Sequence, residues 1–86
     1  MSSFGNVLRE FRIRLMGKQL TLAVSVGCTE AAISFWESDR RLPSPRLLAL
    51  LVKRLTEAGA SPDEVRELVT VYRTAIADRR TEKFVS

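Results

Sequence analysis

Hydrophobic residues recur along the chain with the spacing of amphipathic helices, and they never alternate for long as they would in a strand. This pattern predicts a first helix over Asn6–Met16 and a second over Gln19–Val26. A third helix is predicted to begin near Thr29, because threonine favours the N-cap position. The first half of the chain is therefore expected to form three short helices.

The second half of the chain predicts two further helices. Ser44 and Pro45 suit the N-cap and first position of a fourth helix, which Gly59 ends. Leucines and valines lie nearly all round this helix, so we expect it to be buried on several sides. Residues 61–64, Ser-Pro-Asp-Glu, form a capping box that starts a fifth helix over about 62–79.

Five helices with short connections predict an all-α, compact five-helix bundle. With 86 residues, the chain is too short for a second core, so one domain is expected over residues 1–86, with a frayed tail over 81–86. Hydrophobic residues make up 45% and charged residues 28%, and no apolar run approaches the roughly 18 residues of a membrane-spanning helix. The first residues do not resemble a signal peptide. We therefore expect a cytoplasmic protein without a membrane partner.

The chain has no histidine and one cysteine, Cys28. This composition excludes an internal disulfide, the usual zinc sites and histidine-based acid–base catalysis. We therefore expect no enzyme, no cofactor, no metal and no small-molecule substrate. Cys28 is interpreted as a small packing residue, with redox sensing as the alternative.

The segment over about 19–38 has the pattern of a helix, a tight turn and a second helix. Gly27 lies at the turn, where a positive φ costs little only for glycine. Ile33 and Trp36 can pack the third helix back against the second. This arrangement predicts a helix-turn-helix, whose second helix enters the major groove of DNA.

A set of residues between Leu8 and Ser44 matches the pattern of a known family. The matching residues are Leu8, Arg9, Arg12, Gln19, Leu22, Ala23, Gly27, Ile33, Ser34, Trp36, Glu37, Arg40, Arg41, Pro43 and Ser44. On these residues the chain resembles the lambda-repressor-like (XRE) helix-turn-helix domains of phage and bacterial regulators. It departs from their pattern at Lys18, where Thr or Ser is usual, and at Asp39, where Gly is frequent.

The resemblance implies binding to double-stranded DNA through two kinds of contact. It assigns Gln19 to a backbone phosphate. By their position and chemistry, the further phosphate candidates are Lys18, Thr29, Arg40 and Arg41. The residues that the resemblance assigns to base edges are Glu30, Ala31, Ser34 and Phe35. It also implies that Arg12 and Glu37 form a partly buried, structural salt bridge that fixes the third helix.

Alternatives stay open for the base-contacting residues. Glu30 can accept from a cytosine amino group or simply favour the positive end of its helix. Ser34 can contact a base or bond a backbone carbonyl, and Phe35 can touch a thymine methyl or pack against the core. Arg40 and Arg41 can contact phosphate or form a solvated pair of charges.

Net charge is modest at +4, divided equally between the two halves of the chain. Because a single copy would make few phosphate contacts, we expect a homodimer on a pseudo-palindromic operator, its reading helices about 34 Å apart. The outer stripe around Tyr72 and Ile76 is the predicted dimer interface, with monomer core as the alternative. The function predicted is that of a small phage or bacterial repressor. A protein-interaction module, such as an antitoxin or partner-docking domain, is the second hypothesis.

Overall fold

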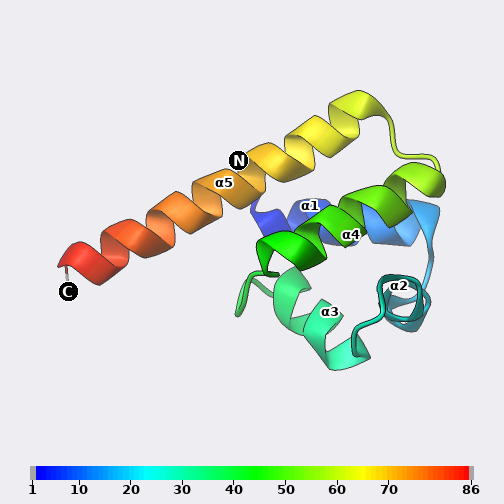
Figure 1. The fold of residues 1–86 in the computed structure, drawn as a ribbon, viewed down its shortest axis with the longest axis horizontal. Coiled ribbons are helices and arrows are strands. Elements are labelled where there is room, and N and C mark those ends of the chain that lie inside the picture. Colours follow the sequence, from blue (N-terminus) through cyan, green and yellow to red (C-terminus); the bar gives the residue numbers. More distant parts are fainter. Residues whose placement is uncertain (1, 86) are drawn as a thin grey trace.

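The computed structural model describes residues 2–85, with the side chains of residues 2–80. It contains five helices, which are α1 (Phe4–Leu15), α2 (Gln19–Val26), α3 (Glu30–Glu37), α4 (Pro45–Glu57) and α5 (Pro62–Val85). No strand occurs within residues 2–85, so the predicted all-α five-helix fold is confirmed. Helices α1 to α4 form the bundle, and α5 crosses it and extends beyond one side (Figure 1).

Three helix starts are fixed by hydrogen bonds between residues close in the sequence. The hydroxyls of Thr29 and Ser44 each accept from a backbone N–H three residues later, at 3.0 and 3.3 Å. Ser61 and Glu64 exchange bonds in both directions, at 2.9 and 3.2 Å, as a capping box does. These local bonds explain why the starts of α3, α4 and α5 were predictable.

The ends of two helices differ from the prediction. Helix α1 begins at Phe4 rather than Asn6, because Ser3 is the N-cap and its hydroxyl accepts from the Asn6 N–H at 3.2 Å. Helix α5 continues to Val85, past the predicted end near residue 79. The end of the predicted frayed tail, Ser86, lies outside the described residues. No helix in residues 2–85, including the long α5, is apolar enough to cross a membrane.

Helix α4 is less buried than its composition suggested. Only Leu51 and Leu55 are fully buried, at 0% and 1% exposed. Its other large apolar side chains are half-buried against the edge of the core; they are Leu47, Leu48, Leu50 and Val52. Helix α4 packs against α1, α2 and α5, so it is covered on several sides as predicted, but its burial is complete only at Leu51 and Leu55.

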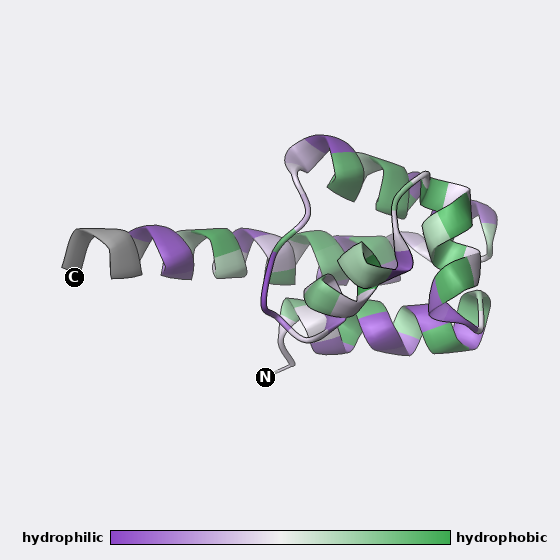
Figure 2. Ribbon diagram, turned by 90° about the horizontal axis from the view of Figure 1, so that it is seen from below, coloured by the Kyte–Doolittle hydropathy of each residue, from purple (hydrophilic) through white to green (hydrophobic). Residues whose placement is uncertain are grey.

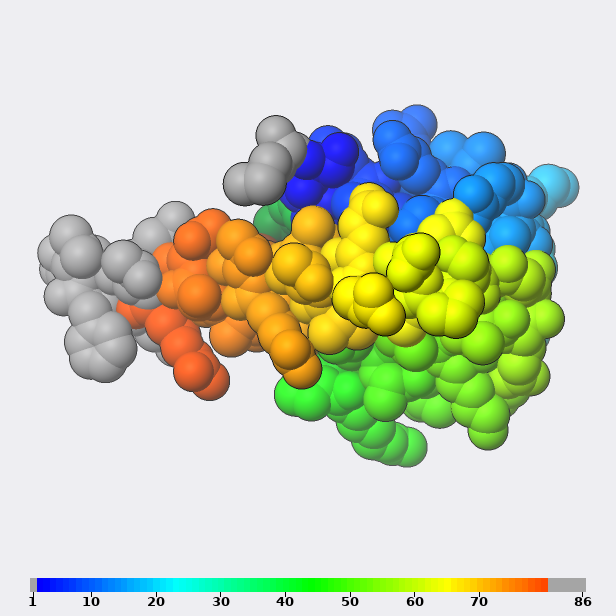
Figure 3. All heavy atoms as spheres, turned by 90° about the horizontal axis from the view of Figure 1, so that it is seen from above, coloured from blue at the N-terminus to red at the C-terminus, as the bar shows by residue number. Residues whose placement is uncertain are grey.

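The core is closed by α5. Viewed from above, this helix lies across α1 and α4, and its C-terminal part projects past them (Figure 3). Its Leu68 is 1% exposed and Tyr72 is 6% exposed. The Tyr72 ring meets Phe4 edge to face with centroids 5.6 Å apart, and its hydroxyl donates to the Pro43 carbonyl at 2.8 Å. Tyr72, predicted at a dimer interface, therefore lies in the core of the single chain.

Candidate nucleic-acid interface

The connection between α2 and α3 is a tight turn built on Gly27. Its φ of 85° lies in the left-handed region, and the N–H groups of Gly27 and Cys28 both donate to the Ala23 carbonyl, at 2.9 and 3.0 Å. A Cβ at this position would meet no atom within 4 Å. Glycine is therefore favoured here by the backbone conformation and not by packing.

Helix α3 has one buried face and one open face. Ile33 and Trp36 point into the core, at 0% and 4% exposed. The opposite face carries the residues predicted to contact bases, of which Glu30, Ala31 and Ser34 are exposed and Phe35 is half-buried. Figure 2 views the bundle from the side on which α2 and α3 lie. The open face is thus free to meet a partner.

The C-terminal end of α3 is closed by Asp39, at the position where the family often has glycine. Its φ of 61° is left-handed, and the next N–H, that of Arg40, donates to the Phe35 carbonyl at 3.0 Å. The Asp39 carboxylate accepts from the Gly5 N–H at 2.9 Å and from the Ser3 hydroxyl at 2.6 Å. The aspartate thus caps the N-terminus of α1 as well as ending α3.

The backbones of α1 and α3 touch at Gly5. A Cβ there would lie 2.4 Å from the carbonyl oxygen of Glu37 and 2.8 Å from that of Trp36. Only glycine permits this approach. The start of α1 is therefore locked against the end of α3.

A buried ion pair makes a second link between α1 and α3. Arg12 donates from Nε and Nη2 to the two carboxylate oxygens of Glu37, at 2.6 and 2.8 Å. Its Nη1 donates to the Gly17 carbonyl at 2.6 Å, and Gln19 Nε2 donates to Glu37 at 3.1 Å. The hydrogen bond to Glu37 raises the pKa of Arg12. The two residues are 8% and 9% exposed, so this network fixes α3 from within.

A sequence model of the helix-turn-helix family matches residues 8–56, which include α2, the turn, α3 and most of α4. The chain belongs to the lambda-repressor-like (XRE) helix-turn-helix family. This is a family of DNA-binding regulators. No curated protein and no solved structure matches the chain.

In this helix-turn-helix protein, the start of α2 differs from the starts of α3 and α4. Lys18 is its N-cap residue, is exposed, and makes no side-chain capping bond. The first N–H groups of α2 are therefore left without a side-chain acceptor, which suits an anion. Gln19 is half-buried beside them, and one of its two amide hydrogens is used by Glu37. The pair can still serve as the predicted phosphate contact.

Arg40 and Arg41 follow the C-terminal end of α3. Both are exposed. The guanidinium of Arg41 lies over the Phe35 ring, 5.1 Å from its centroid. This contact holds the charge beside α3 and explains why Phe35 is half-buried. Arg41 and Phe35 are thus a structural pair that sequence reasoning had treated as two separate contacts.

Cys28 lies in the turn and is half-buried. Burial raises the pKa of its thiol, so less thiolate is present at neutral pH than in an exposed cysteine. Its environment suits a packing role.

Sequence reasoning missed Gly5 and the capping role of Asp39. An isolated glycine just before a helical pattern is a signal of close backbone approach, but it does not name the segment that approaches. Asp39 was identified only as a departure from the family pattern, whereas its bonds to Gly5 and Ser3 span 34 and 36 positions of the sequence. Both features depend on the packing of α1 against α3.

Proposed function

We propose that this protein is a sequence-specific transcriptional repressor that binds a pseudo-palindromic operator in double-stranded DNA as a homodimer. The observation that carries the proposal is the open face of α3, which is held rigidly by two links to α1 on its other side. A rigid helix with one free face is what insertion into a major groove requires. Repression would follow from occupation of a promoter.

The open face of α3 offers few strong base contacts. Glu30 can accept from a cytosine amino group, and Ser34 can bond either a donor or an acceptor on a base edge. The methyl of Ala31 and the Phe35 ring edge suit thymine methyl groups. The open face contains none of the side chains that bind guanine or adenine bidentately. We therefore expect it to be selective at only a small number of base pairs in each half-site.

Phosphate contacts would supply most of the affinity. The donors proposed are Lys18 and Gln19 at the start of α2, Thr29 at the start of α3, and Arg40 and Arg41 after the end of α3. None of the three charged side chains has an ion-pair partner among the described residues. Their charge is therefore available to DNA.

The test is selection of bound duplexes from a random pool by the full chain. We expect a recovered sequence with two inverted half-sites whose centres lie one helical turn apart, and binding that weakens steeply with salt. Recovery of no common sequence, together with no salt-sensitive binding, would contradict the proposal.

Replacing Arg41 with alanine should weaken binding to all duplexes alike and lower the slope of log affinity against log salt by about 2 for the dimer, since one phosphate contact is lost in each of its two chains. The matched control is the substitution of Arg66 with alanine, because it removes the same charge from the exposed start of α5, across the bundle from α3 (Figure 1). Arg66→Ala should leave the slope nearly unchanged. Equal effects of the two variants would contradict a local contact by Arg41.

The proposed dimer uses the part of α5 beyond the bundle. Ile76 is half-buried at its inner edge and lines a shallow hollow with Arg73 and Arg80. Arg79 donates from Nη2 to the Asp39 carbonyl at 2.9 Å, which ties α5 to the loop after α3. A partner seated on α5 would thereby be held in a fixed orientation relative to α3, as half-site spacing requires.

Light scattering should give the mass of two chains for the free protein, or a mass of two chains per duplex for its complex with the selected duplex. Ile76→Asp places a charge in the proposed interface and should shift the population to single chains. Thr56→Asp, which adds the same charge to an exposed position of α4, should not. A single-chain mass for the unaltered protein, both with and without DNA, would overturn the dimer.

A protein partner is the second candidate, favoured by exposed apolar side chains on α2. Leu20 and Val24 lie one helical turn apart and are 53% and 73% exposed. The ribbon of α2 is hydrophobic over most of its length (Figure 2). If selection recovers no duplex, this α2 surface becomes the leading site, and its partner should lose affinity for Val24→Ser.

A further inference from the structure

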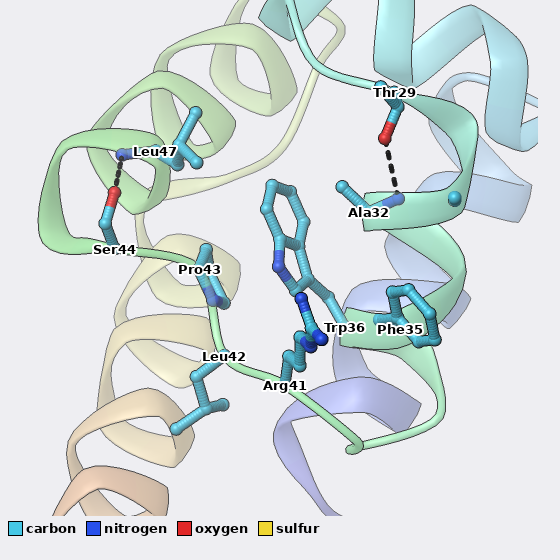
Figure 4. Close-up of a pocket in the computed structure, with 10 residues that line it drawn as sticks. Thr29, Ala32, Phe35, Trp36, Arg41, Leu42, Pro43, Ser44 and Leu47 are labelled. Carbon is cyan, nitrogen blue, oxygen red and sulfur yellow. Dashed lines mark hydrogen bonds between the residues drawn. The ribbon is translucent and has the colours of Figure 1, made fainter.

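A groove of about 310 Å³ lies between α3 and the start of α4. In the close-up of Figure 4, Thr29 and Phe35 come from the α3 side, and Arg41 and Ser44 come from the segment that leads into α4. Trp36 stands between the two sides (Figure 4). No aspartate or glutamate is among the side chains that line the groove within the described part of the chain. Its polar lining therefore favours an anion.

Two helices begin at this groove. Thr29 is the N-cap of α3, which has eight residues, and Ser44 is the N-cap of α4, which has thirteen. Each helix start carries a partial positive charge. The two cap hydroxyls accept from backbone N–H groups, so their own hydrogens remain free to donate. Two positive ends and two hydroxyl donors thus lie at one groove.

The Trp36 indole is an independent sign of a ligand. The residue is 4% exposed, yet no described residue accepts a hydrogen bond from its N–H. The described residues also contain no buried side-chain nitrogen or oxygen that lacks a partner, so this nitrogen must reach solvent through the groove. In Figure 4 it faces the space beside Pro43 and Arg41. The side chain is thus nearly buried, but its N–H reaches the groove without an acceptor from the described residues, and it is available to a ligand there.

The Arg41 guanidinium supplies the charge of the groove. It lies over the Phe35 ring, which limits its motion, and it has no carboxylate partner among the described side chains. A guanidinium held in place loses less freedom when it binds an oxyanion.

We propose that this groove seats one backbone phosphate of the bound duplex, and that Trp36 donates its indole N–H to a phosphate oxygen while Arg41 balances the charge. The inference rests on the proposed DNA-binding function. It gives Trp36 two roles, with its rings in the core and its N–H at the interface. Because the seat lies beside the open face of α3, it would set how deeply that helix enters the groove of DNA.

The test uses the fact that Trp36 is the sole tryptophan of the chain, so its indole N–H gives one signal in a ¹H–¹⁵N NMR spectrum. On addition of the selected duplex we expect this signal to move downfield, as a proton does in a charge-assisted hydrogen bond. Trp36→Phe keeps an aromatic ring in the core but lacks the donor, and it should bind the same duplex about tenfold more weakly.

The contacted phosphate can be located with a set of duplexes, each of which carries one neutral methylphosphonate linkage at a different position. One position per half-site should abolish the shift of the indole signal and weaken the unaltered protein about tenfold. The same modified linkage should weaken binding by Trp36→Phe less than it weakens binding by the unaltered protein, because the indole contact is already lost and only the Arg41 contact remains to be lost. Each protein is compared with itself on the two duplexes, so a modest loss of stability in Trp36→Phe does not affect the result. Circular dichroism checks that the variant is folded.

Two outcomes would overturn the inference. If the unaltered protein binds duplex with salt sensitivity but the indole signal does not move, the phosphate seat is wrong and the proposed function stands. If the unaltered protein binds no duplex, the proposed function fails and the phosphate seat fails with it. Should Trp36→Phe not fold, the indole shift and its loss on one methylphosphonate duplex decide the question in the unaltered protein.

Discussion

Replacing Arg12 with alanine is expected to lower the free energy of unfolding by about 3–5 kcal/mol, the usual cost of breaking a buried ion pair. The substitution leaves the Glu37 carboxylate 9% exposed with only Gln19 as a side-chain donor. It also removes the donor to the Gly17 carbonyl. Since a small domain has a total stability of about 5–15 kcal/mol, the loss should be evident as a large fall in the urea midpoint.

Arg14 provides the matched control for this prediction. It lies on the same helix and also pairs with a glutamate, Glu64, but its side chain is 54% exposed. Arg14→Ala should therefore cost only about 0–1 kcal/mol. In a double-mutant cycle, Arg12→Ala and Glu37→Ala should show a coupling of about 0.5–3 kcal/mol. Additive effects would remove the claim that the pair fixes α3.

Replacing Gly5 with alanine is the second large effect expected. Alanine is the better helix former by about 1 kcal/mol, so propensity alone predicts a gain in stability. The new Cβ would, however, lie 2.4 Å from the Glu37 carbonyl oxygen, a backbone atom that cannot rotate away. Overpacking of this kind costs about 1–3 kcal/mol or more, so we expect a net loss. The end of α3 must also shift, and DNA affinity should fall with it.

Asn6→Ala separates these two effects. Asn6 is the next residue of α1 and its side chain is exposed, so the variant gains helix propensity without a collision. It should be as stable as the unaltered protein or slightly more so in urea denaturation. If Gly5→Ala behaves in the same way as Asn6→Ala, the close contact between α1 and α3 is contradicted.

The parts of the site that were predictable are those that depend on residues near one another in the sequence. Thr29 and Ser44 cap α3 and α4 through bonds to residues three positions away, and Gly27 takes the left-handed turn expected of it. The family was recognised on such local features. Burial was predicted less well, since the half-buried leucines of α4 and the buried Tyr72 depend on which helices lie beside them.

The sequence by itself determined the helices, their caps and the membership of a DNA-binding family, because hydrogen bonds within one helical turn and apolar periodicity are sufficient for these. Only the tertiary structure decided which groups face one another across the bundle. Asp39 caps a helix that begins 35 positions earlier, and Tyr72 donates a hydrogen bond to Pro43 across 29 positions. Trp36 lines a groove between α3 and the start of α4. These contacts exist only once all five helices are packed together.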